Sequence, residues 1–259
     1  MKKLKSKKLD VCICAKNRGA FIRTIVENVK KQSFQDFNII LSDGRSLDST
    51  VSTMIELQSV DPGIKLVQTD ENGRYIDAHN LALNKTVSEY VCWIDSDDVM
   101  TVDKLEKQVK FLDEHPDVDI VTTGVVFNYN GLKMALPNTL VDLTHEEIEK
   151  ALEDGSSLSD ICHFQTAMFR RSCLKDFSKS KFFFDEYEDG RCGEGFLLTL
   201  YYLGHKFANI GEVMYAHNLL PNGMTAKAAG NRTYADKINE MTPGRRKQAV
   251  MRLLEKHNK

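Results

Sequence analysis

The first half of this sequence alternates short hydrophobic runs with amphipathic segments, and this alternation restricts the folds open to the chain. Hydrophobic runs bounded by polar residues predict strands at 9–15, 37–41, 64–67 and 90–94. Apolar residues at helical spacing predict helices at 21–29, 51–57 and 77–85. Strands that alternate with helices form a parallel, doubly wound sheet, whose ligands bind beyond the carboxyl ends of the strands. Each predicted strand ends in a polar break, and we expect the binding site there.

The pattern changes in the second half of the chain, near Leu140. The predicted elements after the fourth strand are a helix at 102–112, strands at 118–127 and 163–170, helices at 144–153 and 193–203, and a hairpin at 206–216 around Gly211. We therefore expect an α/β fold with a doubly wound, mostly parallel sheet in residues 1–140 and a mixed half in residues 141–230. The tail at 231–259 is predicted to be a basic amphipathic helix, interrupted at Pro243 and Gly244.

Charge and hydropathy exclude several classes of protein. The 259 residues carry a formal net charge of -2, which argues against broad nucleic-acid binding. No run of 18 or more apolar residues occurs and no signal-peptide core follows residues 1–8, so we expect a cytoplasmic protein. Both ends are basic and could contact the inner face of an anionic membrane, with simple solvation as the alternative. The six cysteines show no CxxC spacing and are expected to be reduced core residues.

Three carboxylates follow the fourth predicted strand within four positions, at Asp95, Asp97 and Asp98. Side chains alternate along an extended chain, so Asp95 and Asp97 are expected on one side and Asp98 on the other. Neighbouring carboxylates repel unless a cation lies between them, and Mg²⁺ or Mn²⁺ takes one or two protein carboxylates together with substrate phosphates. The cluster therefore predicts a divalent-metal site. Its alternative is a polar turn in which Asp98 caps the next helix.

Four motifs in a fixed order make the chain resemble the family-two glycosyltransferases of the GT-A fold over about residues 9 to 225. The motifs are Ala15-Lys16-Asn17, Ser42-Asp43-Gly44-Arg45-Ser46-Leu47-Asp48-Ser49-Thr50, Asp77-Ala78-His79-Asn80 and Asp95-Ser96-Asp97-Asp98. The resemblance implies that residues 1–140 bind a nucleotide sugar and residues 141–230 bind the acceptor. It implies an inverting hexosyl- or N-acetylhexosaminyltransferase that uses Mn²⁺ or Mg²⁺. The donor is expected to be UDP-linked, and the acceptor a saccharide or lipid-linked hydroxyl in bacterial polysaccharide or glycoconjugate synthesis.

The resemblance also implies roles on the donor side. Asp43 is similar to the acid that accepts a hydrogen bond from the uracil ring, in a turn that Gly44 permits, with capping or turn formation as its alternative. Arg74 lies near the position of a basic residue that faces the diphosphate, and a solvated arginine is its alternative. Asp77 and Asn80 match a motif that lines the donor pocket in the family, and their alternative is a structural role in the first turn of a helix. The donor-binding residues that the resemblance implies are Ala15, Asn17, Asp43, Arg74, Asp77, Asn80, Asp95, Ser96 and Asp97.

The remaining roles concern the metal and the acceptor. Asp97 resembles the family's metal ligand, with Asp95 nearer the ribose or sugar. His217 resembles the late histidine that some members place on the metal or diphosphate, although a lone histidine is often structural. Glu194, in Cys192-Gly193-Glu194-Gly195-Phe196, resembles the acid that takes the proton from the acceptor hydroxyl. Gly195 stands where members usually have a second acid, and the acids that compete for this role are Asp185, Glu186, Glu188 and Asp189.

Departures from the family pattern leave two further interpretations. Lys16 stands in place of a common aromatic residue, Ser42 in place of an acid, and no Gln-x-x-Arg-Trp motif of processive synthases is present. A strand followed by Asp95-x-Asp97-x-Val99 also resembles the nucleophile motif of haloacid-dehalogenase-type phosphatases, although that motif normally lies on the first strand. The other interpretation is a sugar-nucleotide-binding protein that has lost catalysis.

Overall fold

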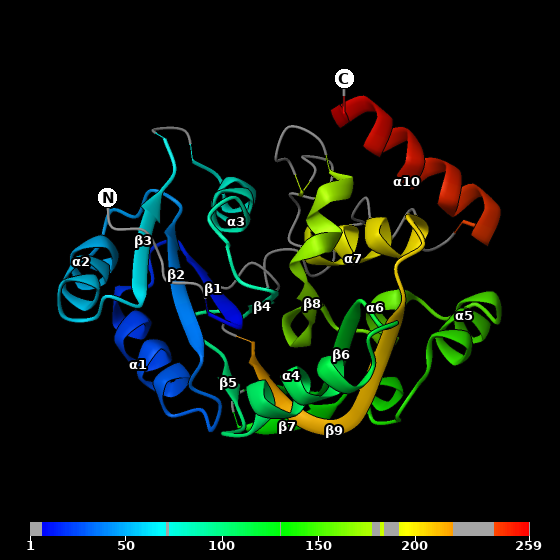
Figure 1. Cartoon of the computed structure of the whole chain (residues 1–259), viewed down its shortest axis with the longest axis horizontal. Coiled ribbons are helices and arrows are strands. Elements are labelled where there is room, and N and C mark those ends of the chain that lie inside the picture. The colour runs from blue at the N-terminus through cyan, green and yellow to red at the C-terminus, as the bar shows by residue number, and fades with distance from the viewer. Residues whose placement is uncertain are drawn as a thin grey trace.

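One mixed sheet runs through the computed structural model, which describes residues 7–70, 73–129, 131–177, 182–183, 192–219 and 241–258 (Figure 1). Within these ranges the sheet has nine strands in the order β3-β2-β1-β4-β8-β6-β9-β5, and β7 pairs with β6. The strands are β1 (Leu9–Ala15), β2 (Phe37–Asp43), β3 (Ile64–Gln68), β4 (Tyr90–Trp93), β5 (Val99–Met100), β6 (Ile120–Tyr129), β7 (Leu132–Ala135), β8 (Met168–Arg170) and β9 (Phe207–Asn218). The α-helices are α1 (Gly19–Lys30), α2 (Thr50–Val60), α3 (Tyr75–Leu83), α4 (Lys104–Glu114), α5 (His145–Glu153), α6 (Leu158–Ile161), α7 (Cys192–Tyr202) and α10 (Pro243–Asn258).

The first four strands are parallel, as the alternation predicted. β1 pairs with β2 and β4, and β2 pairs with β3. Successive side chains of β1 point to opposite faces of the sheet. Val11 and Ile13 join a core formed with α1, α2 and α4, whereas Cys12 and Cys14 join a second core formed with α3 and α7. Helices therefore cover both faces, and the carboxyl ends of β1, β2 and β4 meet at one edge (Figure 1).

Strand directions are mixed in the second half. β8 lies between β4 and β6 and runs antiparallel to both. β9 runs parallel to β6, and the short strand β5 pairs with β9 in the antiparallel direction. These directions confirm the predicted α/β class, with a mostly parallel sheet and a mixed second half.

Two predicted elements of the second half are wrong. In place of a strand at 163–170, a 3-10 turn at Phe164–Thr166 precedes β8, because the Thr166 hydroxyl and N–H both donate to the His163 carbonyl at 2.7 and 3.0 Å. The predicted hairpin around Gly211 is the single strand β9, whose register against β6 shifts near this residue. A Cβ on Gly211 would lie 2.7 Å from the Val141 carbonyl carbon, so the glycine marks a bulge with close backbone approach.

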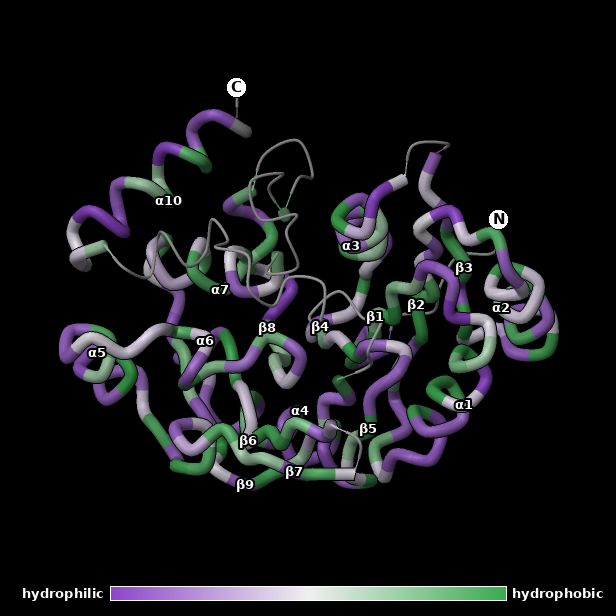
Figure 2. Tube along the Cα trace, turned by 180° about the vertical axis from the view of Figure 1, so that it is seen from behind, coloured by the Kyte–Doolittle hydropathy of each residue, from purple (hydrophilic) through white to green (hydrophobic). Residues whose placement is uncertain are grey.

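The C-terminal helix α10 packs on the body of the protein. Pro243 begins this helix rather than interrupting it, because the first turn of a helix does not use the N–H that proline lacks. Hydrophilic and hydrophobic residues alternate along α10 (Figure 2), and Val250, Leu253 and Leu254 are buried in the core that includes α7. Residues 231–240 of the predicted tail lie outside the described residues. None of the helices in the described part of the chain has the length and apolar content that a bilayer crossing requires.

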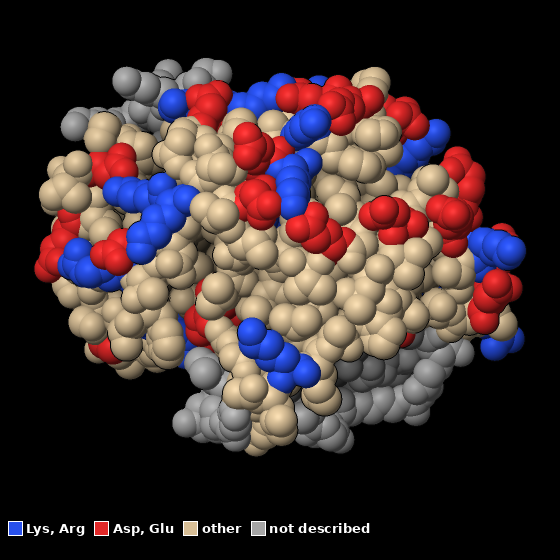
Figure 3. Space-filling view, turned by 90° about the horizontal axis from the view of Figure 1, so that it is seen from below, with Lys and Arg blue, Asp and Glu red and all other residues tan. Residues whose placement is uncertain are grey.

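The burial of the cysteines and the distribution of surface charge agree with what the sequence predicts. All six cysteines are buried and free, which confirms their assignment as reduced core residues. Positive and negative side chains are intermixed on the face shown in Figure 3, with broad uncharged surface between them. This mixture matches the formal net charge of -2.

Candidate active site

The loops that follow β1 and β2 hold each other at the carboxyl edge of the sheet. The Gly44 N–H donates to the Ala15 carbonyl at 2.8 Å, and the Leu47 N–H donates to Asn17 Oδ1 at 2.8 Å. Asn17 and Arg45 adopt left-handed φ values of 55° and 62°, which turn the two loops sharply. Ala15 and Asn17, two of the predicted donor-binding residues, therefore lie against the loop that begins at Asp43.

Asp43 is fully buried at the end of β2. Its carboxylate accepts from Gln68 Nε2 at 2.8 Å and from the Ser46 N–H at 3.1 Å, which matches the turn-forming alternative. The left-handed residue of this turn is Arg45, so the prediction that Gly44 supplies the conformational freedom is wrong. A carboxylate has about four acceptor sites, so the two bonds leave capacity for a donor N–H.

The predicted residues around α3 make structural contacts. Arg74 Nε donates to Asp77 Oδ2 at 2.9 Å, and the Arg74 N–H donates to the same oxygen at 3.0 Å, which caps the helix. Asn80 Oδ1 accepts from the N–H groups of Phe182 and Phe183 at 2.7 and 2.9 Å. Asp77 therefore acts in the first turn of the helix, as its alternative stated. Contact of Arg74, Asp77 and Asn80 with a nucleotide-sugar donor stays a prediction.

The chain turns immediately after β4. The Asp98 N–H donates to the Asp95 carbonyl at 3.3 Å, and Ser96 and Asp97 form the turn between them. The side-chain alternation expected for an extended strand therefore does not apply to the three acids. We call residues 95–98 the acid turn.

Asp98 links the acid turn to β9. Its Oδ2 accepts from Tyr215 OH and lies 2.8 Å from His217 Nδ1, and its Oδ1 accepts from the Asn218 N–H, all at 2.8 Å. The residue that precedes α4 is Asp103, so the alternative in which Asp98 caps that helix is wrong. Asp98 is buried, and its hydrogen bonds fix the acid turn and the end of β9 relative to each other.

The same contacts assemble a cluster of potential metal ligands. One ligand atom each from Asp95, Asp98 and His217 lie within 4.8 Å of one another. Two carboxylate oxygens and an imidazole nitrogen suit Mn²⁺, and carboxylates suit Mg²⁺. Asp97, the predicted ligand, is not one of these three residues, and its Oδ2 lies 3.6 Å from Nε of Arg18. The structure thus groups His217 with Asp95 and Asp98 rather than with Asp97.

Electrostatic effects in the cluster are strong. Burial, followed by the negative charges of Asp98 and Asp97, raises the pKa of Asp95 to about 7. Burial lowers the pKa of His217, but the hydrogen bond and charge of Asp98 outweigh it, and the net effect raises that pKa. A divalent cation relieves repulsion of this kind between carboxylates. The residues present therefore fit the metal that the sequence predicts.

Three further side chains of the cluster were not predicted. Tyr75 OH donates to Asp95 Oδ1, and Gln165 Nε2 donates to Asp95 Oδ2, both at 3.4 Å. No pattern in the sequence marks these two residues, because only the fold brings their segments to the acid turn. Tyr215 could have been found, because it lies two positions before His217 and so on the same side of a strand.

Glu194 lies in the first turn of α7 and is 7% exposed. The preceding Gly193 packs so closely on Phe164 that a Cβ there would lie 2.1 Å from a ring carbon. Phe164 is followed by Gln165, which contacts Asp95, so the start of α7 adjoins the acid turn. The competing acids lie outside the described residues, and they are Asp185, Glu186, Glu188 and Asp189.

Comparison with known proteins decides the family. A family model described as glycosyl transferase family 2 matches residues 10–177, which is more than half of the chain. The chain belongs to this family. Because the match includes the acid turn, the haloacid-dehalogenase interpretation is wrong.

Relatives of this glycosyl transferase family 2 member include two proteins of Bacillus subtilis. It is 35% identical over 156 residues to the putative teichuronic acid biosynthesis glycosyltransferase TuaG of Bacillus subtilis, covering 60% of this chain and 59% of that protein. It is also 32% identical over 112 residues to the putative glycosyltransferase EpsE of Bacillus subtilis, covering 42% of this chain and 40% of that protein. The chain thus spans about three fifths or less of the length of these relatives.

Solved structures share the fold of this family member. It matches S. aureus TarS 1-349 in complex with UDP-GlcNAc with a TM-score of 0.67 and 21% identity, covering 85% of this chain and 60% of that one. It matches the mannosyltransferase PcManGT from Pyrobaculum calidifontis, in complex with GDP-Man and Mn²⁺, with a TM-score of 0.62 and 19% identity, covering 86% and 60%. The fold is therefore the GT-A fold, as the sequence motifs predicted.

Proposed function

We propose that this chain is an inverting glycosyltransferase, which moves a hexosyl or N-acetylhexosaminyl group from a UDP-linked donor to an acceptor hydroxyl during bacterial polysaccharide or glycoconjugate synthesis. The observation that carries the proposal is the cluster of Asp95, Asp98 and His217 at the carboxyl edge of the sheet. TuaG is named for teichuronic acid biosynthesis, and the TarS structure holds UDP-GlcNAc. The name of TuaG supports a polysaccharide product, and the TarS complex supports a UDP-linked donor.

The donor side of the site combines base recognition with charge. Asp43 accepts the uracil N–H, beside the loop of Ala15 and Asn17 that packs on its turn. Arg18 lies at the same edge, close to Asp97, and offers a positive charge toward a diphosphate. The remaining residues of the donor side in this proposal are Arg74, Asp77, Asn80 and Ser96.

The acid turn and His217 would hold Mn²⁺ or Mg²⁺. When bound, the cation neutralises the negative charge that builds on the departing nucleoside diphosphate. Asp98 occupies Nδ1 of His217, so Nε2 is the ring nitrogen that can face a ligand. Asp97, with its partner Arg18, completes the proposed metal side of the site.

The acceptor side supplies the base. In a single displacement the acceptor oxygen forms a bond to the anomeric carbon while the bond from that carbon to the diphosphate breaks, which inverts the configuration. Glu194, at the start of α7 beside the acid turn, takes the hydroxyl proton in this proposal.

In this proposal the basic ends of the chain also make a peripheral contact with an anionic membrane. Lys7 and Lys8 already form ion pairs, with Asp36 at 2.9 Å and with Asp113 at 2.8 Å. The contact would therefore depend on exposed basic residues of α10, such as Arg252. Sedimentation with anionic liposomes tests this, since binding at low salt that disappears at high salt supports it and no binding at low salt contradicts it.

The transfer reaction is tested by measuring UDP and phosphate released from UDP-sugars with Mn²⁺ and saccharide acceptors. Release of UDP without phosphate supports the proposal, whereas calorimetric UDP binding with no turnover on any acceptor indicates the inactive binding protein. Asp97→Ala should weaken UDP binding in Mn²⁺ and change little in chelator. The matched control is Asp103→Ala, because Asp103 is a half-exposed acid that pairs with Lys107 on α4.

A further inference from the structure

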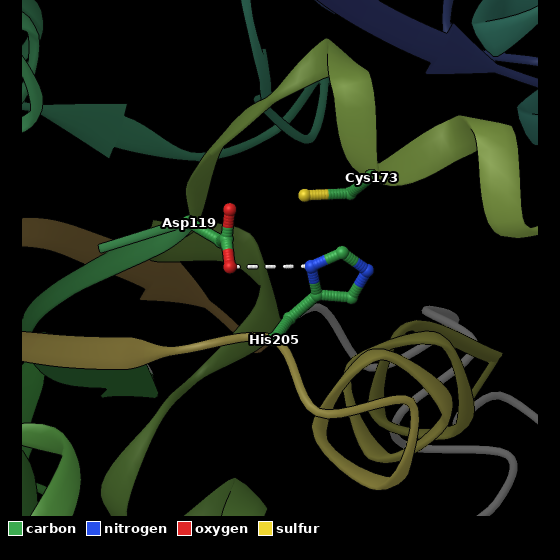
Figure 4. Close-up of side chains that lie close together, drawn as sticks. All are labelled: Asp119, Cys173 and His205. Atoms are coloured by element: carbon green, nitrogen blue, oxygen red, sulfur yellow. Dashed lines mark ion pairs between the residues drawn. The ribbon is translucent and has the colours of Figure 1, made fainter. Parts of the chain in front are cut away.

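Figure 4 shows a second group of potential metal ligands. The group lies at the opposite edge of the sheet from the acid turn. Asp119 immediately precedes β6, Cys173 lies in the 3-10 helix Arg171–Asp176 that follows β8, and His205 lies in the turn between α7 and β9. Arg170, at the end of β8, pairs with Tyr90, at the start of β4. The group therefore lies far from the acid turn, which follows the other end of β4. We propose that Asp119, Cys173 and His205 bind a Zn²⁺ ion.

The three side chains have the spacing that zinc needs. One ligand atom from each lies within 4.8 Å of the others, and Asp119 Oδ2 lies 3.2 Å from His205 Nδ1. Zinc bonds of about 2.0 to 2.3 Å in a tetrahedral arrangement place neighbouring ligand atoms roughly 3.3 to 3.8 Å apart. The Cys173 sulfur lies within the same 4.8 Å limit, and a water molecule can complete the shell. A thiolate, an imidazole and a carboxylate are the ligand types of Zn²⁺ rather than of Mg²⁺ or Ca²⁺.

A fourth residue holds the histidine ring in place. Asp176 Oδ2 lies 2.7 Å from His205 Nε2, on the far side of the ring from Asp119. Zinc-binding histidines typically donate the N–H of the second ring nitrogen to a carboxylate in this way, which fixes the tautomer and the direction of the first nitrogen. Asp176 thus acts as a positioning residue that turns Nδ1 toward Asp119 and Cys173.

The buried thiol adds a third kind of ligand to what would otherwise be an ion pair. An imidazolium between two carboxylates would satisfy His205, Asp119 and Asp176 without any sulfur. Yet the fully buried Cys173 points between Asp119 and His205 (Figure 4). The side chains of His205 and Asp119 are 15% and 28% exposed, so an ion can enter from solvent. On binding, the sulfur forms a bond to zinc and releases its proton to solvent, and zinc replaces the proton on Nδ1.

The position of this site suggests its role. A zinc ion there would join the residues that precede β6 and β9 to the segment that follows β8. These three strands are distant in the sequence and adjacent in the sheet. Such a cross-link stabilises the mixed half of the sheet, because the metal binds only the folded arrangement.

Cobalt titration of the chelator-treated full chain tests the proposal, because Co²⁺ bound to a thiolate gives a charge-transfer absorption. The acid turn cluster offers only oxygen and nitrogen ligands and cannot produce this signal. We expect the absorption to saturate at one equivalent in the parent and to vanish in Cys173→Ala. The matched control is Cys162→Ala, which removes another fully buried thiol and should keep the signal. Absence of the signal in the parent, or its persistence in Cys173→Ala, would overturn the zinc site.

Two variants at partly exposed carboxylates keep the test decisive if Cys173→Ala does not fold. Asp176→Asn should retain the absorption and weaken Zn²⁺ binding by about 10- to 100-fold in competition with a chromophoric chelator. Asp119→Asn should weaken it at least as much, and it preserves an oxygen for the Lys206 N–H that Asp119 accepts at 3.0 Å. Asp117→Asn changes a neighbouring exposed carboxylate and serves as control. Parental affinity in both Asp119→Asn and Asp176→Asn would also overturn the proposal.

Discussion

His217 Nδ1 lies 2.8 Å from Oδ2 of Asp98, although the two residues are 119 positions apart in the chain. The same oxygen accepts from Tyr215 OH, and the other oxygen accepts from the Asn218 N–H. A single buried carboxylate therefore positions the acid turn, the histidine and the end of β9 together. Any ligand that contacts Asp95 and His217 meets a geometry that Asp98 has already set.

Asp98→Asn should therefore affect both stability and ligand binding. The amide keeps only one acceptor oxygen for three donors, and leaving buried donors unsatisfied costs about 1 to 3 kcal/mol in the free energy of unfolding. UDP binding in Mn²⁺ should weaken as well, because His217 loses the charge that orients it. Urea unfolding and calorimetry measure the two effects. Asp103→Asn, which alters a half-exposed carboxylate paired with Lys107, should change stability by less than about 0.5 kcal/mol, and equal stability of the two variants would contradict the role of Asp98.

The first half of the fold was predictable because β1, β2 and β4 are buried along nearly their whole length and helices separate the strands along the chain. The second half was predictable only in part, since β8 contains only Met168–Arg170, and three residues carry no periodic signal. Its insertion between β4 and β6 depends on pairings between distant segments. Gly211 illustrates another limit, because a glycine among apolar residues indicates a hairpin turn and a bulge equally well.

The candidate site also has one part that the sequence predicts and one part that it does not. Acids and small polar residues at strand ends were visible as breaks in the hydrophobic pattern, which is how Asp43 and Asp95 were found. The partners of those acids were not visible. Gln165 and Tyr75 reach Asp95 from segments about 70 and 20 positions away, and no local spacing records such a contact.

Asp43→Asn should reduce the preference for UDP. The variant keeps an oxygen for the Ser46 N–H but removes the charge that would accept the uracil N–H, so UDP binding should weaken by about 1.5 to 3 kcal/mol. Calorimetry with UDP, GDP and dTDP measures the preference directly. Asp61→Asn is the control, because Asp61 accepts the Gly63 N–H in a turn that precedes β3. An unaltered order of affinities in Asp43→Asn would leave turn formation as the only role of Asp43.

Lys104 gives the protein a predictable pH dependence. Its side chain is fully buried, with Nζ 2.7 Å from Gln108 Oε1 and 5.8 Å from the centre of the Tyr215 ring. Burial lowers the pKa of Lys104 from 10.5 to about 8. Between these values the unfolded chain holds a proton that the folded chain has released, so Lys104 makes the free energy of unfolding rise with pH from about 8 to about 10.5.

Lys104→Met should remove this contribution, which amounts to at most about 3 kcal/mol for the fall in pKa from 10.5 to about 8. Urea unfolding of the parent and the variant at about pH 7 and about pH 10 isolates the difference, since other groups titrate in both. Lys110→Met, which changes an exposed lysine on the same helix, should follow the parent. Identical pH dependence in the parent and Lys104→Met would show that Lys104 stays charged in the fold.

Glu194→Gln should separate catalysis from binding. An amide cannot take the proton of the acceptor hydroxyl, so transfer should slow by on the order of 10² or more, the usual contribution of a general base. UDP and Mn²⁺ binding should persist, because the donor side of the site is unchanged, and calorimetry and UDP release measure the two properties independently. The control is Glu147→Gln, which changes an exposed glutamate in the first turn of α5 and should transfer at the parental rate. Near-parental transfer by Glu194→Gln would instead direct the search for the base to the acids at 185–189.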